Sequence, residues 1–195
     1  MMDRIMKVFT FKQEVYKEVE DDASFTQTAW MIVAVVAFLS QLGTNAGLVH
    51  VEGASWVLGT ISGTIFAVAG FAVGAFIISW AGKTFFDADV TYEEMVRTLG
   101  LAYVWNIIGL FGIIGLVSPG LACVVGPIGF AAGIAGLVSW FIAAKEALDL
   151  EWPQTIGTVV IGWVASLIIS LVATAILGVF GIAGYGISSV LRGLR

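Results

Sequence analysis

Long apolar stretches, separated by short polar segments, make up most of the chain after residue 27. A transmembrane helix needs about 20 apolar residues to cross the roughly 30 Å hydrocarbon core of a bilayer. The run from Thr98 to Ala144 is long enough for two crossings, and Ser118-Pro119-Gly120 divides it, because a Pro-Gly pair is a strong turn signal. The pattern therefore predicts five transmembrane helices, at residues 28–49, 56–81, 98–117, 122–143 and 155–181.

The first 26 residues follow a different pattern, in which apolar side chains recur at steps of three and four until Asp21-Asp22. The positions on these steps are Ile5, Val8, Phe9, Lys12, Val15, Tyr16 and Val19. This spacing predicts one amphipathic helix, whose apolar stripe lies in the membrane interface or against the spans. The same stripe is also typical of a helix that binds in a groove of a partner protein. We therefore divide the chain into a cytoplasmic amphipathic head, residues 1–26, a membrane domain, residues 27–183, and a short C-terminal tail, residues 184–195.

The composition agrees with a membrane architecture. Hydrophobic residues make up 59% of the 195 residues, and charged residues make up 12%, whereas ordinary soluble domains are about 45–50% apolar. A soluble globule of this size could not bury so much apolar surface. This excludes a disordered chain, a nucleic-acid-binding protein and a soluble enzyme. The predicted fold class is an all-α membrane protein, a five-transmembrane-helix bundle with an N-terminal amphipathic interfacial helix.

Lysine and arginine are distributed unevenly about the predicted spans. Seven of the nine lie in the head, between the second and third spans, or between the fourth and fifth; the other two are Arg192 and Arg195. Cytoplasmic loops carry an excess of basic residues. We therefore expect a multi-pass protein of the plasma membrane, with its N-terminus in the cytoplasm and its C-terminus outside.

Groups that could carry catalysis or hold a metal are scarce. The single histidine, His50, lies near Glu52, and two such residues are fewer than the three or four ligands of a zinc site. We expect no enzymatic activity, no cofactor, no metal and no nucleic-acid partner. The deepest polar side chains, Gln41, Asn45 and Asn106, are weak candidates for a polar site, because they also suit hydrogen bonds between helices.

The loop between the second and third spans is acidic, with Asp87, Asp89, Glu93 and Glu94. Thr91 and Glu94 have the spacing of a capping box, in which each side chain binds the backbone N–H of the other residue. We expect this loop to begin a short helix that leads into the third span.

Small residues recur at close spacing in two of the predicted spans. The helix-packing candidates are Gly59, Gly63, Gly70, Gly74, Gly129, Gly133 and Gly136. Small residues four positions apart, such as Gly59 and Gly63 or Ala132 and Gly136, allow helix backbones to approach closely in lipid. Such contacts could lie within the bundle, or join the chain to another membrane protein or to a second copy.

Three stretches carry a resemblance to a known family. They are residues 9–15 (FTFKQEV) in the head, residues 89–100 (DVTYEEMVRTLG) before the third span, and residues 144–150 (AKEALDL) before the fifth. With them the chain resembles the Yip1 family of small five-span membrane proteins, in its bacterial and archaeal form, over roughly residues 5–180. The resemblance implies a five-helix bundle without known catalytic residues, a cytoplasmic N-terminus, and a role through partners or membrane shape.

The leading functional hypothesis is a non-enzymatic adaptor or accessory subunit that contacts membrane lipids and binds other membrane proteins or further copies of itself. It rests on the scarcity of catalytic groups, the glycine rows and the amphipathic head. The alternative is a small channel, carrier or lipid-moving protein for a neutral or lipid substrate. That alternative rests on the interrupted apolar run between Pro119 and Pro127 and on the polar outer half of the first span.

Overall fold

The structure, a computed structural model, describes residues 2–47, 53–117, 120, 122–165 and 167–168. All regular secondary structure in these residues is helical. The elements are α1 (Met2–Phe9), α2 (Glu14–Asp21), α3 (Phe25–Thr44), α4 (Gly53–Phe86), α5 (Tyr92–Ala102), the 3-10 helix η2 (Tyr103–Ile113), α6 (Ile114–Val117) and α7 (Ala122–Leu148). Residues 152–165 are also helical.

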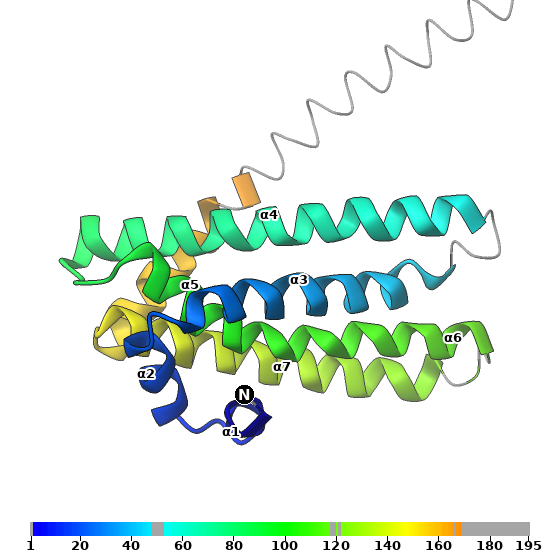
Figure 1. The fold of residues 1–195 in the computed structure, drawn as a ribbon, viewed down its shortest axis with the longest axis horizontal. Coiled ribbons are helices and arrows are strands. Elements are labelled where there is room, and N and C mark those ends of the chain that lie inside the picture. The colour runs from blue at the N-terminus through cyan, green and yellow to red at the C-terminus, as the bar shows by residue number, and fades with distance from the viewer. Residues whose placement is uncertain (1, 48–52, 118–119, 121, 166, 169–195) are drawn as a thin grey trace, which may run out of the picture.

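The long helices run side by side, with α4 and α7 on the outside (Figure 1). α3 packs against α4 and against the continuous stretch of α5 and η2, which in turn packs against α7. Four helical segments in the described chain are long and apolar enough to cross a membrane. The predicted fold class, an all-α membrane protein, is confirmed. The fifth predicted span begins within the helical residues 152–165, and its part beyond residue 168 lies outside the described residues.

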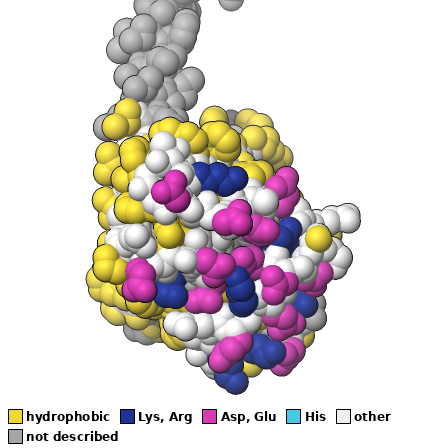
Figure 2. Space-filling view, turned by 90° about the vertical axis from the view of Figure 1, so that its left-hand side faces the viewer, with side chains coloured by type: hydrophobic (Ala, Val, Ile, Leu, Met, Phe, Trp, Pro, Cys, Tyr) yellow, Lys and Arg dark blue, Asp and Glu magenta, His cyan; other side chains and the backbone are white. Residues whose placement is uncertain are grey.

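Charged side chains gather at one end of the bundle. Figure 2 views the end that carries α2 and the connection between α4 and α5, and Lys, Arg, Asp and Glu side chains cover much of it. Apolar side chains lie at the margin of this end, where the sides of the bundle begin. This distribution is what a helix bundle needs when its sides face lipid and its end faces water.

Two helix boundaries at this end differ from the sequence prediction. α4 continues to Phe86 instead of ending at residue 81, and its 34 residues span about 51 Å, more than the hydrocarbon core requires. The third span begins at Tyr92 instead of residue 98 because a cap starts the helix earlier. Thr91 Oγ1 accepts a hydrogen bond from the Glu94 N–H at 3.2 Å, and the Glu94 carboxylate accepts one from the Thr91 N–H at 2.6 Å. The predicted capping box is confirmed.

The head contains two helices, so the prediction of one amphipathic helix is wrong. The chain turns between α1 and α2, and Phe11 adopts a left-handed backbone conformation with φ of 54°. One unbroken helix would place Lys12 on the same stripe as Val8 and Val15. The break leaves Lys12 exposed while Val8 and Val15 are fully buried. The cost of burying a charged ammonium group therefore favours two helices over one.

The middle of the third span is a 3-10 helix, which the prediction of one apolar span did not anticipate. In a 3-10 helix, side chains three residues apart lie on the same face. Gly109 and Gly112 are spaced in this way, and the larger apolar residues Leu110 and Phe111 lie between them. A Cβ on Gly109 would lie 2.2 Å from Ser40 Oγ. The three-residue repeat of this segment therefore matches its helix type and turns its glycines toward α3.

Candidate functional site

The head is docked on the charged end of the bundle. Val15, Tyr16 and Val19 of α2 are fully buried, and α2 packs against α5 and α7. The apolar stripe was expected to lie either in the membrane interface or against the spans. In α2 it packs against the spans. Each buried aliphatic side chain contributes about 1.5–3 kcal/mol where it leaves water, so the docked position is stabilised mainly by apolar contact.

A buried hydrogen bond connects the head to α7. The hydroxyl groups of Tyr16 and Ser139 lie 2.5 Å apart, and both residues have no exposed surface. Burial raises the pKa of Tyr16 to about 12, although the hydrogen bond to Ser139 acts in the opposite direction. The docked head therefore favours the neutral phenol.

The raised pKa of Tyr16 predicts that alkaline pH weakens the docking of the head. The folded-state pKa lies about two units above the ordinary value of 10, so this stabilisation is complete below about pH 10 and is lost as pH rises toward about 12. Between about pH 9 and pH 12 the wild type should lose on the order of 2 kcal/mol of stability that a Tyr16→Phe variant does not lose. Thermal unfolding of both proteins in detergent, across this pH range, measures the loss of stability. Equal losses of stability at alkaline pH in the two proteins would contradict the prediction.

Arg97 fastens the end of α2 to α5 and is only 7% exposed. Its Nε donates a hydrogen bond to the Glu20 carbonyl oxygen at 3.0 Å, and its Nη2 donates to the same oxygen. Its Nη1 donates to Thr26 Oγ1 at 3.2 Å. A cation at the C-terminus of a helix binds free carbonyl groups and interacts favourably with the helix dipole.

An ion pair joins α2 to the end of α7. Lys17 Nζ lies 3.0 Å from a carboxylate oxygen of Asp149 and 3.1 Å from one of Glu20. Burial lowers the pKa of Lys17, but its hydrogen bonds to the two carboxylates outweigh this, so the pKa lies above its ordinary value. Lys17 therefore remains charged at neutral pH, and the pair is partly exposed, so it contributes at most about 1 kcal/mol.

Aromatic side chains hold the turn of the head against η2. The Phe9 ring meets the Trp105 ring edge-on at 4.8 Å between centroids, and the Phe11 ring stacks on Trp105 at 5.6 Å. Such aromatic pairs contribute about 0.5–1.5 kcal/mol beyond burial. They compensate for the left-handed conformation of Phe11, which ordinarily costs a non-glycine residue about 1–2 kcal/mol.

The glycine candidates fall into two groups. Gly63 and Gly136 lie in close contacts, because a Cβ would be 2.4 Å from Gln41 Oε1 and 2.9 Å from Trp105 Cβ, respectively. Four others have nothing within 4 Å of an added Cβ in the described chain: Gly70, Gly74, Gly129 and Gly133. Gly59 is partly buried in α4. The role of these glycines in helix packing stays a prediction.

Two of the polar candidates lie together. Asn45 donates hydrogen bonds to the backbone oxygen and to Oε1 of Gln41, at 3.0 and 2.9 Å. Gln41 occupies the space that the absent side chain of Gly63 leaves on α4. The pair thus lies at the contact between α3 and α4, as expected for polar groups within a bundle.

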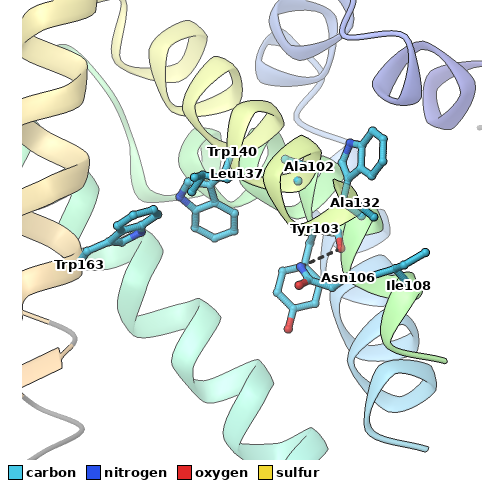
Figure 3. A pocket seen from close by; sticks show the side chains of 11 residues that line it. Ala102, Tyr103, Asn106, Ile108, Ala132, Leu137, Trp140 and Trp163 are labelled. Carbon is cyan, nitrogen blue, oxygen red and sulfur yellow. Dashed lines mark hydrogen bonds between the residues drawn. The ribbon is translucent and has the colours of Figure 1, made fainter. Parts of the chain in front are cut away.

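Asn106, the third polar candidate, lies elsewhere, beside a cavity of about 330 Å³ between η2, α7 and the helical residues 152–165. Its Nδ2 donates to the Tyr103 carbonyl at 3.2 Å. Figure 3 shows Tyr103 and Asn106 on one side of this cavity, with Trp140 and Trp163 across from them. The indole nitrogen of Trp140 has no hydrogen-bond partner among the described residues and almost no accessible surface, so it does not reach the open space of the cavity.

The closest contact between helix backbones in the described chain joins α3 to η2, at glycines outside the predicted packing candidates. A Cβ on Gly43 would lie 2.1 Å from the Gly109 carbonyl oxygen, and one on Gly112 would lie 2.5 Å from the Gly43 carbonyl oxygen. The sequence does contain a signal for this contact, because Gly109 and Gly112 are three residues apart, the spacing that places two side chains on one face of a 3-10 helix. A search for glycines four residues apart misses this spacing.

A model of the Yip1 domain matches residues 6–174 of the chain. The chain belongs to the Yip1 family. The match begins within α1, so the head is part of the Yip1 domain, and this Yip1 protein is a multi-pass membrane protein. Neither the curated proteins nor the solved structures contain a match to the chain.

The Yip1 family is not a known enzyme family. Within the described ranges, no group of three or more His, Cys, Asp or Glu side chains could hold a metal ion. His50 and Glu52 lie outside the described residues. The described residues of this Yip1 protein form helix-packing surfaces and a docked head.

Proposed function

We propose that this Yip1 protein acts without catalysis, as an adaptor or accessory subunit that binds other membrane proteins through helix contacts within the bilayer. We place it in the plasma membrane with the head in the cytoplasm, because seven of its nine basic residues lie on that side of the predicted spans. The observation that carries the proposal is a helix-binding row on α4 of which half has no close neighbour among the described residues.

This row consists of Gly70, Gly74, Ile78 and Gly82, spaced four residues apart along one side of α4. Near the charged end of the bundle, this row already packs against the helical residues 152–165. A Cβ on Gly162 would lie 2.7 Å from Ile78 Cγ1, and one on Gly82 would lie 3.7 Å from Thr158 Cγ2.

The other half of the row is open. Gly70 and Gly74 have nothing within 4 Å of an added Cβ among the described residues. Lipid chains fill such a groove less closely than a helix backbone does, and small-residue rows are typical of helix interfaces in membranes. The open half therefore suits a further helix, which we assign to a partner protein; the chain's own fifth predicted span, residues 155–181, is the alternative occupant that the variants below distinguish from a partner.

A double variant, Gly70→Leu with Gly74→Leu, tests this assignment, with Ala69→Leu as the matched control because Ala69 is also exposed on α4. We expect the double variant to keep its melting temperature in detergent and to lose co-purification of a stoichiometric membrane protein by about tenfold or more. The control should keep both. Loss of the fold in the double variant would show that the row packs within the chain, and undiminished co-purification would show that the partner does not use it.

The aromatic cavity favours a second candidate, a carrier or lipid-moving protein for a neutral or lipid substrate. The residues that line this cavity include Tyr103, Asn106 and Trp163. An apolar cavity with a few polar groups is the usual form of a small-molecule site. Vesicles that contain the purified protein test it through the flux of small solutes and labelled lipid. Flux above protein-free vesicles, abolished by Gly133→Trp in the cavity wall, would favour transport over the adaptor role.

A further inference from the structure

An apolar groove of about 350 Å³ lies between α1, α3 and η2, on the side of the bundle. Its floor is one face of α3, formed by Thr28, Met31, Ile32, Val35 and Val36. Each of the later four lies three or four residues from one before it, at successive turns of the helix, so the groove runs along the axis of α3. Thr28 at its charged end is the only polar residue of the lining.

The other walls of the groove come from the head and the 3-10 helix. Ile5 and Phe9 of α1 close it near the charged end, and Val104 and Ile107 of η2 form its second side. Figure 1 shows α1 nearly end-on while the long helices run across the view, so α1 lies across the bundle axis. The groove is thus open along the membrane direction and covered by an interfacial helix at one end.

We propose that this groove binds one acyl chain of a membrane phospholipid, which the head holds in place. From Thr28 to Val36 the groove is about 12 Å long, close to the roughly 15 Å thickness of one leaflet of hydrocarbon. An apolar cavity of about 150 Å³ already accommodates benzene, so 350 Å³ holds a longer stretch of chain.

The groove is continuous with the lipid-facing surface of α3. Met31 and Val35 line the groove and are still 54% and 57% exposed. Phe38, one turn further along, is 42% exposed on the same helix and lies outside the groove lining. A lipid chain can therefore enter from the bilayer sideways, without leaving hydrocarbon.

Lys12 follows the groove residue Phe9 by three positions, so it lies within about 11 Å of Phe9. Phe9 of the groove and Phe11 both pack on the Trp105 ring, so Lys12, which follows Phe11, is near the charged end of the groove. Lys12 is exposed and has no ion-pair partner in the described part of the chain. A lysine ammonium is a good donor to phosphate oxygens.

The remaining cations of the head already have carboxylate partners. Arg4 pairs with Glu18, Lys7 with Asp3, and Lys17 with Asp149. Lipid tails gain little hydrophobic free energy by moving from the bilayer to a protein surface. Retention of the lipid therefore depends on dispersion contacts along the groove and on the phosphate contact to Lys12. The adaptor role does not require this site, so the two proposals stand separately.

Native mass spectrometry of the full-length protein, after stepwise delipidation in detergent, tests the site with added phosphatidylcholine or phosphatidylglycerol. Val35→Trp fills the groove from a lipid-exposed position, and Phe38→Trp is the matched control on the same helix. We expect one phospholipid to remain on the wild type and on the control, and Val35→Trp to reduce its occupancy by about tenfold or more. Lys12→Gln should lower the occupancy of both lipids, because both carry a phosphate.

A phospholipid with a photoreactive acyl chain gives an independent readout in vesicles. At a limiting ratio of lipid to protein, cross-links should concentrate on residues 5–9 and 31–36. Equal retention by wild type and Val35→Trp would overturn the proposal. Cross-links spread evenly over α3, α4 and α7 would also overturn it, because they would show only the lipid that surrounds any membrane protein.

Discussion

Replacing Gly43 by alanine is expected to lower the free energy of unfolding by about 3 kcal/mol, the upper part of the range for overpacked cores. The added methyl group would lie 2.1 Å from the Gly109 carbonyl oxygen and 2.8 Å from the Leu110 Cα. Both are backbone atoms, so no side-chain rotation relieves the clash. α3 and η2 would have to separate along the contact that holds the centre of the bundle together.

Gly70→Ala is the matched control for this experiment, because an added Cβ there has nothing within 4 Å in the described chain. Both variants replace a helical glycine by alanine, so each gains about 1 kcal/mol of helix propensity, and the difference between them isolates the clash. Thermal unfolding in detergent, followed by size-exclusion chromatography, measures it. Equal melting temperatures for Gly43→Ala and Gly70→Ala would show that α3 and η2 are not in close contact.

The second large effect is expected at Arg97, where an Arg97→Gln variant should lose about 3 kcal/mol of stability and release the head. The substitution removes the donors to the Glu20 carbonyl and to Thr26. It leaves a buried carbonyl at the end of α2 without a partner. Arg97→Lys should recover only part of the loss, because an ammonium group cannot reproduce the planar fork of a guanidinium.

Limited proteolysis measures the release of the head directly. Cleavage between residues 10 and 13 should become faster in Arg97→Gln, while Lys83→Gln should leave it unchanged. Lys83 is an exposed residue near the end of α4. Unchanged cleavage in the Arg97 variant would mean that the apolar contacts of Val15, Tyr16 and Val19 hold the head without it.

The sequence predicted the membrane class and most of the helices because span length and capping are local properties. Twenty apolar residues can satisfy their backbone in lipid only as a helix, and the Thr91–Glu94 cap depends on residues three apart. The weak polar candidates Gln41 and Asn45 also lie together, since a four-residue step brings them to one face.

The sequence did not predict the features that depend on distant partners. The break at Phe11 is stabilised by Trp105, and nothing in residues 1–26 identifies that partner. The Tyr16–Ser139 hydrogen bond joins residues 123 positions apart. The 3-10 helix has a local three-residue repeat, but its glycines acquire their role only when Ser40 and Gly43 lie against them. These features depend on long-range packing, which the periodicity of the sequence does not predict.

Site-specific photo-cross-linking in the native membrane shows whether the open half of the α4 row faces another membrane protein. Phe66, 68% exposed, lies one turn of α4 before Gly70, next to the open half of the row, and can be replaced by a benzophenone-bearing phenylalanine. Phe38 on α3 is the control position. We expect position 66 to cross-link to one defined membrane protein and position 38 to cross-link to lipid. Cross-links from position 66 to lipid alone, or to this chain's own residues, would contradict it.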